Sequence, residues 1–520
     1  MKWIYGAVFS VLLLVIVLSC SQENTIGPYE ESFLSKEEIS MMNFNIDISY
    51  GFKNNEPRLI IEESFSIPRQ RFGLQLPNNF MRQDRLFDQI EDLQVTNGEL
   101  FSHEKLPYIK LIKTDGDSRV TLRYLVKPLI KENFSASIIR DNYFQFVGSM
   151  LLITPIALDA DSDFNISINW NVNEKFYILN SFGAFDKRQN FSSSLNKLWD
   201  GLFVGGDDIR YKKIAINNNP IHIAFNGYWN KFNDTDLIAM VNKLITIQRN
   251  TWNDNNFPYF LVSFLSLDKE CSSRVRYAGT AHQNSFRAYF PQDCPLLPEM
   301  NELISHELMH MWIGKKIMVG QERGKIDGKW FTEGFSDYYG RVMAYRAGLI
   351  SENNYFNSLN RELENYSLSS EKNTSLSGLV SRMYKKESSS IELEKLPYQQ
   401  GELMAINLNK DIKIASNFKY SLDNVIKDML DEARNNGQSK NFSIDELDTI
   451  FKKYLSNGIK PYLTKIINGE FINPTKLAGC KELTTKKTTY FRQAAQYITN
   501  AIFYYKNSMY GDYNCDKWLK

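Results

Sequence analysis

The residues with the clearest chemistry in this sequence are two histidines and two glutamates near its centre. His306 and His310 are four residues apart, about one helical turn, so both imidazoles leave one helix face and can bind one metal ion. Glu307 lies between them, where a carboxylate can act as a general base beside the metal. Two histidines and one glutamate are a common catalytic zinc set, and Glu333 is the candidate third ligand. The pattern predicts a zinc hydrolase.

The alternative is a purely structural pair of histidines. The chain has only five histidines, and an HExxH run arises by chance in on the order of a few of a thousand such sequences. The surroundings also suit a helix, because Pro298 and Glu299 favour its start and Gly314 favours its end. Zinc is preferred over non-haem iron because Glu307 has a role in hydrolysis and none in oxygenase chemistry.

The elements that must position these residues fall into two regions, which predicts a multidomain α+β fold. From 38 to 205 apolar residues alternate with period two between turn residues, which indicates an antiparallel β domain resembling a sandwich. From 206 to 480 apolar residues at helical spacing indicate a mostly helical catalytic domain. The alternating sets are Phe44, Ile46, Ile48 and Tyr50, then Val120, Leu122, Tyr124 and Val126, then Phe164, Ile166, Ile168 and Trp170.

Helix signals in the second region place the glutamate ligand. Thr332 can cap a helix that carries Glu333, runs to about Ala347 and ends at Gly348. The segment 367–390 is rich in Ser and Lys and is expected to be a surface loop. Further helix starts are predicted at Asn233 or Thr235 and at the capping box of Ser443 and Glu446.

The N-terminus resembles a bacterial export signal. An apolar run from Trp3 to Leu18 leads to Ser19 and Cys20, as in a secretion signal that ends at a lipid-attachment cysteine. We expect a signal at 1–19, a tether at 20–37 and an exported lipoprotein anchored to a membrane on its periplasmic or cell-surface side. A signal that is simply cleaved and an uncleaved anchor are the alternatives, although the run is short for a spanning helix.

Cysteine usage fits an exported protein, and the balanced charge gives no sign of a nucleic-acid partner. Apart from Cys20 there are four cysteines, an even number that permits disulfides in an oxidising compartment. With 61 basic and 60 acidic side chains the net charge is +1, so no basic field favours nucleic acid as a partner. Of three connectivities the simplest joins Cys271 with Cys294 and Cys480 with Cys515.

The motifs resemble those of the gluzincin metallopeptidases. HELMHMWIG at 306–314 and KWFTEGFSDYYG at 329–340 are similar to the zinc-binding motifs of that group. The 22 residues between His310 and Glu333 exceed the spacing typical of the aminopeptidase N family, and the second motif is closer to the glycyl aminopeptidase family. The resemblance covers about 180–480. It implies a thermolysin-like catalytic domain at 206–480, zinc as cofactor and a peptide or protein substrate.

Further residues take their expected roles from this resemblance. Tyr398, in the run PYQQG, resembles the tyrosine that stabilises negative charge on the substrate oxygen in these families, with packing as the alternative. Asp337, one turn after Glu333, is either a support for the metal site or a solvated carboxylate. The strand GTAHQNS resembles one that binds substrate in the glycyl aminopeptidase family, so its residues Gly279, Thr280, Ala281 and His282 are expected to bind substrate.

One position departs from the family pattern. The glutamate that anchors the free ammonium of an aminopeptidase substrate is Ala281 here, so aminopeptidase activity is implied by family while endopeptidase activity stays an alternative. The backbone of the strand could still pair with an extended peptide. His282 either lines the substrate cleft or makes a buried structural hydrogen bond.

The C-terminal region departs as well. Members of the glycyl aminopeptidase family usually carry a C-terminal PDZ domain, whereas the stretch 481–520 is too short for one. We expect a short tail, held by Cys480 and Cys515 if they pair. The alternative function is a catalytically idle lipoprotein of the same fold that binds peptides or partners.

Overall fold

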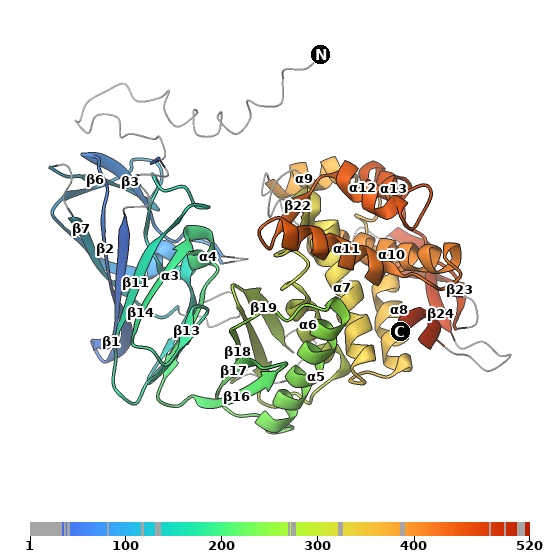
Figure 1. The fold of residues 1–520 in the computed structure, drawn as a ribbon, viewed down its shortest axis with the longest axis horizontal. Coiled ribbons are helices and arrows are strands. Elements are labelled where there is room, and N and C mark those ends of the chain that lie inside the picture. Colours follow the sequence, from blue (N-terminus) through green and yellow to red (C-terminus); the bar gives the residue numbers. More distant parts are fainter. Residues whose placement is uncertain are drawn as a thin grey trace, which may run out of the picture.

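The N-terminal part of the chain is rich in β-strands and the C-terminal part is helical, with one sheet between them (Figure 1). Within the residues described, no helix is long and apolar enough to cross a membrane. The expected signal, Cys20 and nearly all of the tether lie outside these residues. The computed structural model describes residues 34–35, 38, 42–80, 83–115, 119–129, 137–268, 271, 277–320, 326–384, 390–477, 480–492, 496–506 and 515–520.

Three β-sheets of the N-terminal part share one hydrophobic core. The predicted alternation is confirmed, because the inward-facing residues of β1, β7 and β11 are buried, apart from the partly exposed Tyr50. The first sheet has the order β14 (Arg188–Ser194), β11 (Asp163–Asn171), β1 (Asn43–Lys53), β2 (Glu56–Ser66), β7 (Arg119–Val126) and β4 (Ile90–Thr96).

The expectation of a purely antiparallel domain is wrong in one place. β1 and β11 pair in parallel, with Ile46 opposite Ile168. Parallel neighbours need a long connection, and here the chain runs through other strands before it returns as β11. The second sheet has the order β10 (Thr154–Pro155), β3 (Arg71–Gln75), β6 (Ile109–Lys113) and β5 (Glu99–Ser102). The third has the order β13 (Gly183–Ala184), β12 (Tyr177–Asn180), β15 (Leu202–Gly206), β9 (Tyr143–Val147) and β8 (Ile138–Arg140), and η1 (Leu86–Gln89), α3 (Gly148–Leu151) and α4 (Leu195–Trp199) are short helices.

A five-stranded sheet connects the two parts. One face, with Ile223 and Phe264, packs in the core of the helical part, whereas Leu261 and Tyr289 on the other face belong to the N-terminal core. Burial on both faces explains the nearly continuous apolar run of β18. The order is β16 (Arg210–Ile216), β17 (Asn219–Asn226), β18 (Phe260–Leu267), β20 (Ser285–Pro291) and β19 (Ala278–His282), so β19 is an edge strand paired antiparallel with β20.

The helical part follows this sheet. The predicted caps are confirmed where Asn233 caps α5 and where Ser443 and Glu446 form a capping box on α12. The 367–390 loop prediction is wrong in part, because α9 forms there with Leu379 buried. The helices are α5 (Asp234–Trp252), α6 (Pro298–Met309), α7 (Lys329–Arg346), α8 (Glu352–Leu368), α9 (Leu376–Tyr384), α10 (Ile391–Ala415), α11 (Leu422–Asn435), α12 (Ile444–Lys452) and α13 (Lys460–Asn468), with η2 (Ile326–Gly328) and the short strands β21 (Ile317–Val319) and β22 (Lys440–Phe442).

The C-terminal tail packs on these helices. It forms the hairpin β23 (Glu482–Arg492) and β24 (Gln496–Lys506) and the helix α14 (Asp516–Leu519). The side-chain amide of Asn360 on α8 donates to the Tyr505 carbonyl at 2.8 Å and accepts from the Tyr505 N–H at 2.6 Å. Both predicted cysteine pairs are confirmed as disulfides, Cys271 with Cys294 and Cys480 with Cys515, and the second joins the tail to the end of the helical part.

Candidate metal centre

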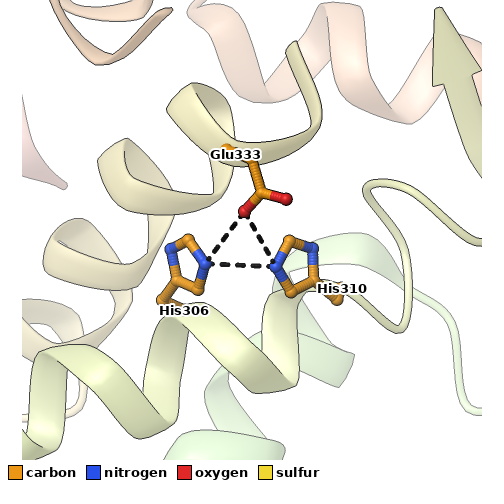
Figure 2. Close-up of side chains that lie close together, drawn as sticks. All are labelled: His306, His310 and Glu333. Atoms are coloured by element: carbon orange, nitrogen blue, oxygen red, sulfur yellow. Dashed lines mark hydrogen bonds and ion pairs between the residues drawn. The ribbon is translucent and has the colours of Figure 1, made fainter. Parts of the chain in front are cut away.

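α6 presents both histidines of the HExxH run. It begins at Pro298, as predicted, and buries Met300, Ile304 and Leu308. It ends at Met309 rather than near Gly314, so His306 lies in its last turn and His310 is the residue that caps its end. Although α6 ends at Met309, His306 and His310 keep the i, i+4 spacing of a helix, and both imidazoles point to the same side (Figure 2).

α7 brings the glutamate to this face of α6. It begins at Lys329, four residues before the expected start, because Trp330 and Phe331 are buried and continue the helical pattern towards the N-terminus. Gly340 allows the close approach, since a Cβ there would lie 3.0 Å from the backbone nitrogen of His306. Glu333 therefore projects from within α7, which packs closely against α6.

The three predicted ligand atoms converge on one point. His306 Nε2 and His310 Nε2 are 3.1 Å apart, and Glu333 Oε2 is 3.6 Å from the first and 3.5 Å from the second (Figure 2). Tetrahedral zinc with bonds of about 2.1 Å places neighbouring ligand atoms about 3.4 Å apart. The donor set and its spacing therefore fit a zinc ion without rearrangement.

The other ring nitrogens fix the orientation of both imidazoles. His310 Nδ1 lies 3.1 Å from the Ile313 carbonyl, which can only accept, so Nδ1 carries the proton. His306 Nδ1 lies 2.7 Å from Asp337 Oδ1. Both Nε2 atoms face Glu333, and Asp337 takes the supporting position rather than that of a solvated carboxylate.

The electrostatics of the cluster favour a bound cation. Burial raises the pKa of the Glu333 carboxyl, but the two imidazoles beside it outweigh this and hold its pKa well below the usual range. Burial lowers the pKa of His306, but the carboxylates of Asp337 and Glu333 raise it well above the usual range. The carboxylates of Glu307, Glu333 and Asp337 thus lie close to the two imidazoles, and a divalent cation would balance their negative charge.

Glu307 lies along the edge strand β19. The Ala281 N–H donates to Glu307 Oε2 at 2.9 Å, and a Cβ on Gly279 would lie 3.3 Å from Glu307 Cγ. Ala281 and Phe286 are directly opposite in the β19–β20 pair, yet the Ala281 N–H points away from β20 to Glu307. The edge of this strand that pairs with no other strand of its sheet thus faces the helix of the predicted metal site, and Glu307 occupies its Ala281 N–H.

The strand alternation turns the other two expected substrate-binding side chains away. Thr280 and His282 are buried on the opposite face of β19 from Gly279 and Ala281. His282 Nδ1 lies 3.2 Å from Asp200 Oδ1, and burial lowers the pKa of His282 to about 4. Of the two readings of His282, the structure supports the buried structural contact.

Tyr398 stands beside the first histidine. It lies inside α10, with Pro397 accommodated in the same helix, and its ring centroid is 6.2 Å from that of His306. Gly401 lets α10 approach α7, because a Cβ there would collide with the Trp330 carbonyl. Burial raises the pKa of Tyr398, and Glu333 raises it further, so the hydroxyl keeps its proton as a donor.

A buried ion cluster below the site was not expected from the sequence. Arg341 on α7 lies 2.8 Å from Glu402 on α10 and 3.2 Å from Glu302 on α6, and it also contacts Ser358 on α8. Glu302 is therefore part of the interior. The cluster ties together the helices that carry His306, Glu333 and Tyr398, and these long-range pairings have no local sequence signal. The aromatic residues of α7 and of the loop after α6 are buried packing residues, namely Trp312, Trp330, Phe331, Phe335, Tyr338 and Tyr339.

One family model and one solved structure are similar to parts or all of this fold. Residues 299–404, from the start of α6 into α10, match the sequence profile of the M61 glycyl aminopeptidases. The fold is similar to the crystal structure of an aminopeptidase N family protein from Idiomarina loihiensis, with a TM-score of 0.68 and 14% sequence identity, over 88% of this chain and 81% of that chain. No curated protein sequence matches the chain.

Proposed function

Because the segment that carries the site is glycyl-aminopeptidase-like, we propose that the protein is a zinc-dependent peptidase of the gluzincin type. The observation that carries the proposal is the convergence of His306 Nε2, His310 Nε2 and Glu333 Oε2 within the spacing of tetrahedral zinc ligands. The catalytic part is thermolysin-like in this proposal, with two packed helices presenting the ligands. Zinc bound there would polarise the scissile carbonyl and lower the pKa of water.

The residues of the chain divide the remaining work. Glu307 accepts the proton of the attacking water and delivers it to the leaving amine, because its carboxylate lies beside the ligands and next to the open strand β19. Tyr398 donates its hydroxyl hydrogen to the oxygen that gains negative charge, and Asp337 holds the ring of His306. No covalent acyl-enzyme is formed.

The open edge of β19 suits an extended peptide as substrate. A peptide strand can pair with the main chain of Gly279 and Ala281, which recognises backbone rather than side chains. We propose that a free N-terminus is not required, because a desolvated ammonium needs a charge partner and residue 281 is alanine. Carboxylates near the ligands already have partners, namely Asp337 with His306, Glu302 and Glu402 with Arg341, and Asp200 with Lys315.

We also propose export and anchoring to a membrane through a lipid on Cys20. The support is the apolar run before Cys20 together with two disulfides, which form and persist outside reducing compartments. A Cys20→Ala variant should lose metabolic labelling by a fatty acid and move from the membrane to the soluble fraction.

The test of the function combines metal content with turnover on a peptide library. We expect one equivalent of zinc, cleavage that stops on chelation and returns with zinc, and a loss of about 10²- to 10⁴-fold in kcat for Glu307→Gln with its zinc retained. Zinc at one equivalent without cleavage of any peptide would reject the peptidase. It would favour the catalytically idle binding protein instead.

A further inference from the structure

Asp200 contacts two segments that border the proposed active site. It follows α4 in the N-terminal part, and its Oδ1 lies 3.2 Å from His282 Nδ1 at the end of β19. Its Oδ2 lies 3.0 Å from Lys315 Nζ in the loop after α6. Its backbone carbonyl accepts from the Gln283 N–H at 3.0 Å. One residue of the N-terminal part therefore contacts both the edge strand β19 and the loop after α6.

The two contacted segments carry parts of the site. Ala281, whose N–H binds Glu307, precedes His282 directly. Lys315 is two residues after Ile313, whose carbonyl orients the ring of His310. β19 is an edge strand that pairs within its sheet only with β20, so its other side depends on contacts of this kind. Asp200 thus links the end of this strand to the loop whose Ile313 carbonyl contacts His310.

The charges around Asp200 favour its contacts with Lys315 and His282. Burial raises the pKa of the Asp200 carboxyl, but Lys315 and His282 outweigh this effect and lower the pKa below its usual value. The carboxylate therefore stays ionised. The Asp200 side chain is 41% exposed and that of Lys315 is 24% exposed. An ion pair this exposed contributes little to global stability. Its effect should appear in local geometry rather than in the unfolding temperature.

We propose that Asp200 is a positioning residue, which sets the spacing between the edge strand β19 and the loop after the metal-binding helix. The N-terminal part thereby helps to shape the substrate site of the helical part. The effect on peptide substrates rests on the proposed function. The contacts of Asp200 with β19 and the loop after α6 are independent of it.

The first test measures geometry without activity. Asp200→Asn keeps the shape of the side chain and removes its charge. We expect amide hydrogen exchange in residues 278–283 to become about tenfold faster, while exchange in α5 and the zinc content stay unchanged. Lys315→Met removes the other end of the ion pair and should give the same change. The double variant should add little to either single variant, because both break one contact.

The second test uses substrate length. For Asp200→Asn we expect kcat/KM to fall about tenfold on a six-residue peptide, mainly through KM, and less than about twofold on a single-residue chromogenic amide. Asp254→Asn is the matched control, because Asp254 holds Lys316 of the same loop at 2.6 Å from the α5 side. That control should affect long and short substrates by the same factor.

Unchanged exchange at β19 in both single variants would overturn the inference, and so would equal losses on long and short substrates. The wild-type protein could cleave no peptide while exchange at β19 still rises in the variants. That result would reject the peptidase proposal and keep the positioning role of Asp200.

Discussion

His306 and Asp337 face each other across α6 and α7, with the imidazole Nδ1 2.7 Å from the carboxylate Oδ1. Asp337 lies one turn after Glu333, so α7 supplies both the third proposed ligand and the partner of the first. A carboxylate behind a ligating imidazole fixes its tautomer and makes it a stronger ligand.

Asp337→Asn should therefore weaken zinc binding by about 10- to 100-fold, because an amide oxygen accepts the Nδ1–H bond more weakly and leaves the imidazole a weaker ligand. Competition with a chelator of known affinity measures the change. Asp445→Asn, on the exposed side of α12, is the control and should bind zinc as the wild type does. Equal zinc affinity in all three proteins would show that the contact is structural.

Tyr398→Phe should lower kcat by about 10²- to 10³-fold with little change in KM, because the hydroxyl acts on charge that develops only in the transition state. Steady-state kinetics on one peptide substrate, with zinc content measured in parallel, checks this. The control is Tyr228→Phe, which removes a hydroxyl from a ring that is 72% exposed. A Tyr398→Phe variant with wild-type kcat would show that another group donates the hydrogen bond to the substrate oxygen.

Local patterns predicted the features that local chemistry determines. The alternation of β1, β7 and β11, the cap at Asn233 and the capping box at Ser443 were all visible in the sequence. The HExxH spacing placed His306 and His310 correctly, because one helical turn fixes their relation whatever the rest of the fold does.

The errors and omissions come from tertiary contacts. Thr332 has a good capping side chain, yet α7 starts earlier because Trp330 and Phe331 gain burial inside the helix. The helix around Tyr398 was also not predicted: α10 continues through Pro397 while Leu393 and Leu396 pack in the interior. The contacts of Asp200 join segments far apart in the chain, so no spacing rule could have found them.

The stability of the N-terminal part should depend on pH through Glu63. Its Oε1 accepts from the Tyr124 hydroxyl at 2.8 Å and from the Ile153 N–H at 3.1 Å, whereas its Oε2 has no hydrogen-bond partner among the described residues. Burial raises the pKa of Glu63 to about 8, despite these two donors.

The folded state therefore keeps a proton on Glu63 that the unfolded chain has released above about pH 4.3. Stability is fully present below that value and falls as pH rises to about 8. Glu63→Gln should remove this decline and stabilise the protein at pH 8 by on the order of a few kcal/mol, with little effect at pH 4. Urea unfolding at both pH values checks it, with Glu62→Gln as the control. An unchanged pH slope in Glu63→Gln would assign the dependence to other groups.

Blocking the substrate amine should change cleavage little if Ala281 removes the need for an ammonium. The same peptide is offered with a free and with an acetylated N-terminus, and we expect the two kcat/KM values to agree within about tenfold. A site that binds a buried ammonium through a carboxylate would discriminate far more strongly, because losing a buried charged contact costs several kcal/mol. Ala281→Glu supplies a matched variant, since it restores a carboxylate beside Glu307 and should shift preference towards the free amine. Cleavage of the free peptide alone by the wild type would establish an aminopeptidase that anchors the ammonium by other groups.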